Sequence, residues 1–201
     1  MNFQIICILF ILFIPFNLWG YESTGTKENQ SSVPPLALSW GAKVHLVNFN
    51  PSQERKIRAA LKIIKNIISS PEFKERIINY QYKGRKGFID NKGLSNEEIY
   101  RMILEGAEER SGIKKDNTMD VELELYFQEA KTIGYTYPDT DRIWINEKYF
   151  AQYTPIKVAD NLMHEWMHKL GFSHSSKWSE DREHSIPYAV GYLIEELANK
   201  P

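Results

Sequence analysis

The sequence predicts a mixed α+β fold built around a single core. Along the chain, segments with apolar residues at helical spacing alternate with shorter segments in which apolar and polar residues alternate. The 201 residues are 42% hydrophobic and 25% charged, with a formal net charge of -1. This composition suits one globular domain, and its charge balance favours neither nucleic acid nor an anionic membrane surface as a partner.

The first 20 residues have the pattern of a secretory signal peptide. Residues 5–16 are nearly all apolar, and a polar stretch begins at Tyr21. Residues 1–4 carry no Lys or Arg, so an uncleaved membrane anchor is the alternative, although the apolar run is short for a bilayer span. We expect a secreted protein, either extracellular or periplasmic.

A second N-terminal segment separates the signal from the folded part. Residues 21–35 are rich in Ser, Thr, Pro and charge and lack apolar periodicity, which is typical of a flexible segment. A short pro-segment over the functional site is the alternative. We expect residues 36–201 to form the domain, without disulfides, because the only cysteine, Cys7, lies in the signal.

The domain is expected to begin with a strand at residues 43–49, which alternate apolar and polar side chains. A helix follows, with Asn50 as N-cap, Pro51 at its first position and Gln53 placed to reach back to the cap. Its apolar stripe comprises Ile57, Leu61, Ile64 and Ile68. Pro71 ends or restarts this helix, with a shorter helical piece at residues 73–80.

The central part of the domain contains a segment with the strict alternation of a half-buried strand. Residues 120–129 alternate strictly, which places Val121, Leu123, Leu125 and Phe127 on the buried face and the acids on a solvated face. Before it, residues 84–90 suggest a short strand. A capping box at Ser95 starts a helix that we expect Ser111-Gly112 to stop.

Two further strands precede the last helices. Residues 132–137 and 142–146 flank a turn at residues 138–141, and Gly134 favours an edge position for the first of them. Thr154 as N-cap and Pro155 at the first position then start the next helix.

This helix and the residues after it contain the candidate functional side chains of the chain. His164 and His168 are four residues apart, so they lie on one helix face and can share a metal ion. Glu165 lies beside that ion, where it can act as general base on a water molecule. Gly171 can adopt the left-handed conformation that ends a helix and can return His174 to the same ion. Three protein ligands with one open position are typical of catalytic zinc.

The full pattern H-E-x-x-H-x-x-G-x-x-H resembles that of the metzincin metallopeptidases at every fixed position. The alternative is a surface helix that carries His and Glu by chance. For residues 43 to the end, the resemblance implies a metzincin-like twisted mixed sheet, two long helices of which one carries the zinc motif, and a small C-terminal subdomain that ends in a helix.

The resemblance also implies the cofactor and the partner. The cofactor is Zn²⁺, held by His164, His168 and His174, with Glu165 as catalytic base. The substrate is a polypeptide in extended conformation, which pairs with the edge strand at residues 132–137. We expect a monomer, with no nucleic-acid partner and no stable membrane association after signal cleavage.

The sequence departs from metzincins after the third histidine, where the family has a Met-containing turn beneath the metal. The stretch Ser185-Ile186-Pro187-Tyr188 resembles the Ser-Ile-Met-x-Tyr turn of astacin-like members, with Pro in place of Met and one residue fewer. The resemblance then implies that Tyr188 is a candidate for a catalytic role at the zinc or the oxyanion. The alternative is packing under the C-terminal helix, together with Tyr192, Ile194 and Leu197. His184 is expected at the surface.

Together these features predict a secreted zinc metalloendopeptidase. Two alternatives stay open: a zinc amidase that acts on cell-wall peptides through the same machinery, and a zinc-bearing binding module without catalysis. The retained Glu165 argues against the binding module, because a structural site has no use for a carboxylate there.

Overall fold

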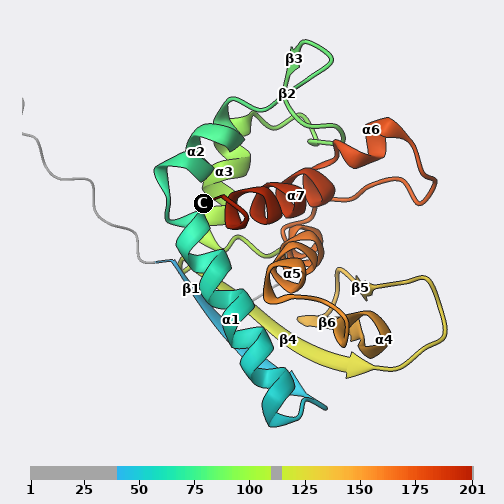
Figure 1. Ribbon diagram of the computed structural model, residues 1–201. Helices are drawn as coiled ribbons and strands as arrows, with labels where there is room; N and C mark the ends of the chain where they lie inside the picture. Colours follow the sequence, from blue (N-terminus) through green and yellow to red (C-terminus); the bar gives the residue numbers. More distant parts are fainter. Residues whose placement is uncertain (1–39, 110–114, 201) are drawn as a thin grey trace, which may run out of the picture. The chain divides into compact units, whose positions relative to one another are not determined.

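The computed structural model describes residues 40–109 and 115–200, which all belong to one unit of the chain, Ala37–Pro201 (Figure 1). The expected signal peptide and the segment at residues 21–35 lie outside the described residues. Within the part that is described, no helix is both long and apolar enough to cross a membrane.

A four-stranded mixed sheet forms one layer. Its strands are β1 (Gly41–Val47), β4 (Thr118–Tyr126), β6 (Arg142–Asn146) and β5 (Gly134–Thr136), in that spatial order. The first three are parallel to one another, and β5 is antiparallel to β6 at the edge. The predicted strands at these four places are confirmed, including the edge position of the strand that contains Gly134.

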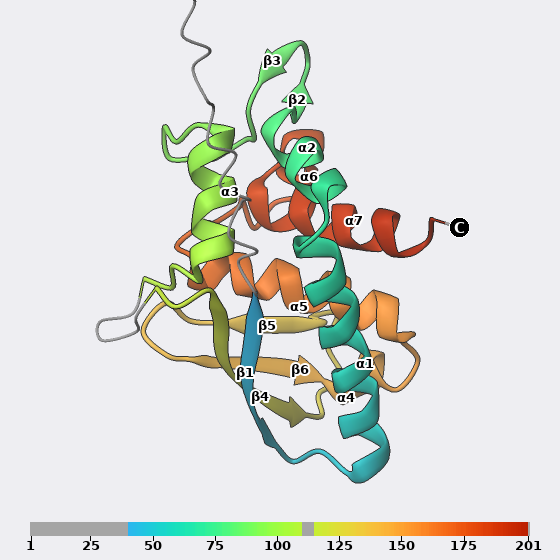
Figure 2. The same ribbon diagram turned by 90° about the vertical axis from the view of Figure 1, so that its left-hand side faces the viewer.

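The helices vary widely in length. They are α1 (Pro51–Ile68), α2 (Pro71–Ile78), α3 (Asn96–Glu105), α4 (Glu147–Phe150), α5 (Pro155–Lys169), α6 (Glu180–Glu183) and α7 (Ile186–Ala198). A small hairpin, β2 (Gln81–Tyr82) and β3 (Arg85–Lys86), follows α2. In both views α5 lies between the sheet and α7, with α1 packed along it (Figures 1 and 2). The mixed α+β class is thus confirmed.

Local sequence signals explain where the helices begin. Asn50 Oδ1 accepts hydrogen bonds from the backbone N–H of Ser52 (2.9 Å) and of Gln53 (3.0 Å), and Gln53 Oε1 accepts from Asn50 N (2.8 Å). Thr154 Oγ1 accepts from the backbone of Lys157 (3.2 Å) at the start of α5. These predicted caps satisfy N–H groups that a helix leaves without intrahelical partners.

The core lies between the sheet and the helices. Strand β4 buries alternate side chains there, and α1 contributes Ile57, Ile64 and Ile68, each fully buried. Trp166 and Met167 of α5 are also fully buried. On the other face of the sheet, Glu122 and Glu124 pair with the guanidinium of Arg142, so the acids of β4 are neutralised across the strands as well as solvated.

Three sequence predictions about element boundaries are wrong. Helix α3 ends before Ser111-Gly112, because Gly106 takes a left-handed conformation (φ 59°) in which an added Cβ would lie 2.0 Å from the Thr118 carbonyl oxygen. Phe127 is 64% exposed, because β4 ends at the preceding residue. The strand expected at residues 84–90 is a hairpin arm followed by a single bridge from Ile89 to Ser185.

The buried stripe of α1 generates a stability prediction. We expect Ile64→Ala to lower the free energy of unfolding by about 2–5 kcal/mol, because the side chain is fully buried between helix and sheet and leaves a cavity. Lys65→Ala, at the exposed neighbour, is the control and is expected to change stability by less than about 0.5 kcal/mol. Urea denaturation measures both, and an equal effect of the two variants would contradict the predicted packing.

Candidate metal centre

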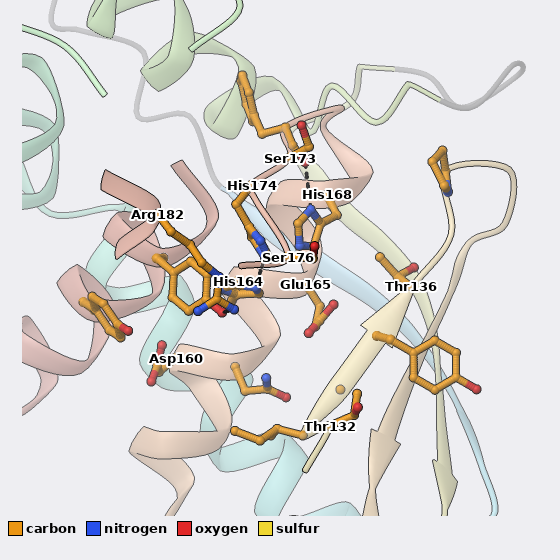
Figure 3. A pocket seen from close by; sticks show the side chains of 18 of the residues that line it. Thr132, Thr136, Asp160, His164, Glu165, His168, Ser173, His174, Ser176 and Arg182 are labelled. Atoms are coloured by element: carbon orange, nitrogen blue, oxygen red, sulfur yellow. Dashed lines mark hydrogen bonds between the residues drawn. The ribbon is translucent and has the colours of Figure 1, made fainter. Parts of the chain in front are cut away.

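Helix α5 and the segment after it bring three imidazoles together (Figure 3). The ring of His164 lies 5.2 Å from that of His168 and 5.1 Å from that of His174, and the last two rings are 4.9 Å apart, centroid to centroid. One ring nitrogen from each lies within 4.8 Å of the others. Within residues 40–109 and 115–200, this is the only group of three or more His, Cys, Asp or Glu side chains that could hold a metal ion in this way.

The turn after α5 brings the third histidine back. Gly171 has φ 89°, and its backbone N–H donates to the His168 carbonyl (3.1 Å), as in a left-handed helix end. The positive φ favours glycine here, because other residues rarely adopt this conformation. The conformation predicted for Gly171 and the proximity of His174 are both confirmed.

Backbone carbonyls orient two of the imidazoles. His168 Nδ1 lies 2.8 Å from the Phe172 carbonyl oxygen, and His174 Nδ1 lies 3.0 Å from the Ser175 carbonyl oxygen. A carbonyl can only accept, so each Nδ1 carries the proton and each Nε2 keeps its lone pair. Such contacts are the usual second layer around a metal-binding histidine.

The protonation states also suit a cation. Burial lowers the pKa of His164 to about 2 and the pKa of His168 to about 4, and burial lowers the pKa of His174 as well. All three rings are therefore neutral at pH 7. His164 Nε2 and His174 Nε2 are 3.1 Å apart, close to the roughly 3.3 Å expected of two nitrogens on one tetrahedral zinc. The donor set thus fits a divalent metal ion that prefers nitrogen.

Glu165 lies between α5 and the edge strand β5 (Figure 3). It is only 4% exposed, and burial raises its pKa to about 8 against an opposing effect of the Lys169 ammonium. An added Cβ at Gly134 of β5 would lie 3.2 Å from Glu165 Oε1 and 3.1 Å from Asn161 Oδ1. The glycine therefore allows the edge strand to approach the carboxylate closely.

A cleft of about 900 Å³ contains these groups. Its walls are the edge strand with its flanking loops, the exposed face of α5, the loop that carries His174, and the start of α7. The two sides of the cleft meet at His164 and Glu165, which both line it. A substrate in this cleft would lie against the edge strand and the three imidazoles together.

The edge strand is anchored at both ends. Asn146, fully buried, donates to the carbonyls of Gln128 (2.9 Å) and Thr132 (3.1 Å) before the strand. After it, the buried Lys169 donates to the Tyr137 carbonyl (2.8 Å). The strand therefore has a fixed position relative to α5, which supplies Lys169 and the imidazoles of His164 and His168.

The stretch from Ser185 to Tyr188 differs from the expected turn. Ser185 is the N-cap of α7 and Pro187 lies in its first turn, so these residues begin a helix. The Tyr188 ring nevertheless lies 4.3 Å from the ring of His164 and 4.7 Å from that of His174. Its proximity to His164 and His174 is thus established, while a role in catalysis stays a prediction.

Two other expectations about this region are wrong. Tyr192 is 41% exposed and lines the cleft, so it does not share the buried face of α7 with Ile194. His184 is half-buried, with Nδ1 2.6 Å from the Tyr80 hydroxyl and its ring stacked on Tyr82 at 3.8 Å. It therefore attaches the β2–β3 hairpin to the segment before α7.

Sequence reasoning missed several side chains of the cleft. Arg182 contacts Tyr188 and the loop that carries His174, and Asp160 pairs with Lys157 (2.7 Å) one turn before His164. Asp160 and Lys157 form an i,i+3 pair on α5, but nothing in that spacing indicates that Asp160 lines a cleft, and the partners of Arg182 include a side chain on another helix.

Comparison with protein-family models, with curated proteins and with solved structures finds no match.

The pKa values predict how many protons a metal ion displaces. At pH 7 the three histidines have no proton to release, whereas Glu165, with a pKa of about 8, is mostly protonated. A cation beside it lowers that pKa, so zinc binding at pH 7 should release about one proton more from the wild type than from Glu165→Gln. Calorimetry in buffers of different ionisation enthalpy measures this difference, and equal proton release by the two proteins would contradict it.

Proposed function

We propose that this chain is a secreted zinc-dependent endopeptidase that resembles the metzincins. One observation supports this above the others: three imidazoles, two of them with Nδ1 held by a backbone carbonyl, converge beside a buried carboxylate in an open cleft. A purely structural zinc site is usually closed by four protein ligands. The open cleft and the adjacent Glu165 instead favour catalysis.

The proposed mechanism assigns a role to each group. A zinc ion bound by the three histidines would act as a Lewis acid on the scissile carbonyl and lower the pKa of water at the site. Glu165 takes a proton from the attacking water and returns it to the leaving amine. In the metal-free protein burial raises its pKa, and a bound cation would favour the ionised form that can accept this proton. Tyr188 is the proposed donor to the developing oxyanion, since its ring lies beside His164 and His174.

The proposed substrate is an extended polypeptide. In the sheet β5 pairs with β6 on one side, and its other side borders the cleft. An added strand can therefore use the free backbone groups of β5, which favours main-chain recognition of many sequences. Such a strand would carry its backbone past Gly134, where Glu165 is closest.

The test is hydrolysis of an unstructured protein such as casein by the zinc-loaded protein. We expect the wild type to cleave it and Glu165→Gln to lose about 10²–10⁴-fold in turnover while it still binds zinc, because the ligands are untouched. Glu97→Gln, at an exposed position on α3, is the matched control and should keep full activity. Metal content is measured on all three proteins by mass spectrometry.

Two results would count against the proposal. A fully active Glu165→Gln contradicts the assigned base. A zinc-loaded wild type that cleaves neither casein nor a panel of reduced proteins contradicts the endopeptidase, and hydrolysis of a cell-wall peptide amide would then identify the substrate class instead.

A further inference from the structure

Arg182 belongs to the short helix α6, outside the zinc motif, yet its guanidinium contacts the groups next to the three imidazoles. Its Nε donates to the Ser175 carbonyl (2.9 Å), its Nη1 to Glu183 Oε1 (3.1 Å) and its Nη2 to the Tyr188 hydroxyl. In Figure 3, Arg182 and Glu165 lie to either side of the imidazoles.

The first contact bears on the orientation of His174. The Ser175 carbonyl that accepts from Arg182 also accepts from His174 Nδ1 (3.0 Å), so one oxygen joins the guanidinium to the ring. For His168 the equivalent carbonyl belongs to Phe172, which is 2% exposed and is held in the turn after α5. Ser175 instead lies in an exposed segment without regular structure. Its carbonyl therefore depends on a side chain for its position.

The second contact bears on Tyr188. The guanidinium carbon of Arg182 lies 4.2 Å from the centre of the Tyr188 ring, and Nη2 reaches the hydroxyl. Stacking and a hydrogen bond together limit the rotation of the ring, which lies beside His164 and His174.

Arg182 is itself held in place before any ligand binds. Its side chain is 19% exposed and paired with Glu183, and its backbone N–H donates to Ser179 Oγ (3.1 Å) at the start of α6. The planar fork of arginine can donate in several fixed directions at once, which the single ammonium of lysine cannot do.

We propose that Arg182 is a positioning residue with two separate effects. It orients His174 for the metal through the Ser175 carbonyl, and it orients Tyr188 for the reaction. The first effect requires only that the centre binds a metal ion, whereas the second rests on the proposed peptidase function. No element of the H-E-x-x-H-x-x-G-x-x-H pattern includes Arg182.

The first experiment measures zinc affinity by competition with a chelator, without any substrate. We expect Arg182→Gln to bind zinc about 10–100-fold more weakly than the wild type, as is usual when the partner that orients a metal ligand is lost. Arg182→Lys keeps the charge but not the fork and should also bind more weakly. Arg58→Gln is the control, since Arg58 is exposed on α1 and pairs with Glu54 of the same helix, and the zinc affinity of this variant should be unchanged.

The direction of the change in zinc affinity shows whether Arg182 acts by positioning His174 or only through its positive charge. If Arg182 acted only as a nearby positive charge, its removal would tighten zinc binding, because a cation would meet less repulsion. Unchanged or tighter binding by Arg182→Gln would therefore overturn the first effect. Thermal unfolding of the metal-free variants shows whether a loss of affinity is only a loss of folding. A drop in melting temperature that accounts for the whole loss would also overturn it.

The second experiment measures turnover at saturating zinc in a double-mutant cycle with Tyr188→Phe. We expect Tyr188→Phe to keep zinc affinity, and Arg182→Gln to lower kcat in the wild-type background but not further in the Tyr188→Phe background. If the two substitutions lowered kcat independently of each other, the proposed effect of Arg182 on Tyr188 would be overturned. A change confined to the KM of peptides with a free C-terminal carboxylate would overturn it too, because Arg182 would then bind substrate directly.

Negative results in the two experiments lead to different conclusions. If the wild type binds zinc but cleaves no peptide, the proposed function is contradicted, and the affinity series still decides the effect on His174. If the wild type binds no zinc, the metal centre and the positioning role are both overturned.

Discussion

The positions of the metal-binding side chains depend on one constraint: helix α5 has to bury one face in the core and present another to the cleft. Met163, Trp166 and Met167 are fully buried, while His164 and His168, interleaved with them, face the open side. The buried face fixes the rotation of the helix, because any turn about its axis would expose large apolar side chains. The positions of the imidazoles are therefore set by packing that has no direct part in metal binding.

The same burial determines the electrostatics of the site. Removal from water keeps the imidazoles of His164 and His168 neutral and raises the pKa of Glu165 to about 8. In the metal-free protein these groups thus avoid buried charge. A bound cation would reverse the balance for Glu165 and favour its ionised form. Close packing of α7 contributes to this burial, since an added Cβ at Gly191 would lie 2.5 Å from Asp160 Oδ1 and 3.5 Å from His164 Cβ.

Much of this was predictable because the signals are local. The caps at Asn50 and Thr154, the alternation in β4 and the spacing from His164 to His174 each depend on residues close together in sequence, and the structure contains all of them. The errors arise where tertiary contacts decide. Gly106 ends α3 because the chain must pass close to Thr118, and the stretch from Ser185 to Tyr188 begins a helix that packs on α5. Arg182 gave no signal, because its contacts with the Ser175 carbonyl and with Tyr188 follow no sequence pattern and depend on how the segment before α7 folds back.

We propose a metal centre in which three histidines of this chain hold one zinc ion and leave a position open. X-ray absorption spectroscopy of the zinc-loaded protein tests it most directly. We expect three imidazole nitrogens at about 2.0–2.1 Å and one further light atom from solvent, and the loss of one imidazole in a His174→Ala variant. A zinc shell of oxygen atoms without imidazole, or the same shell in the wild type and in His174→Ala, would contradict it.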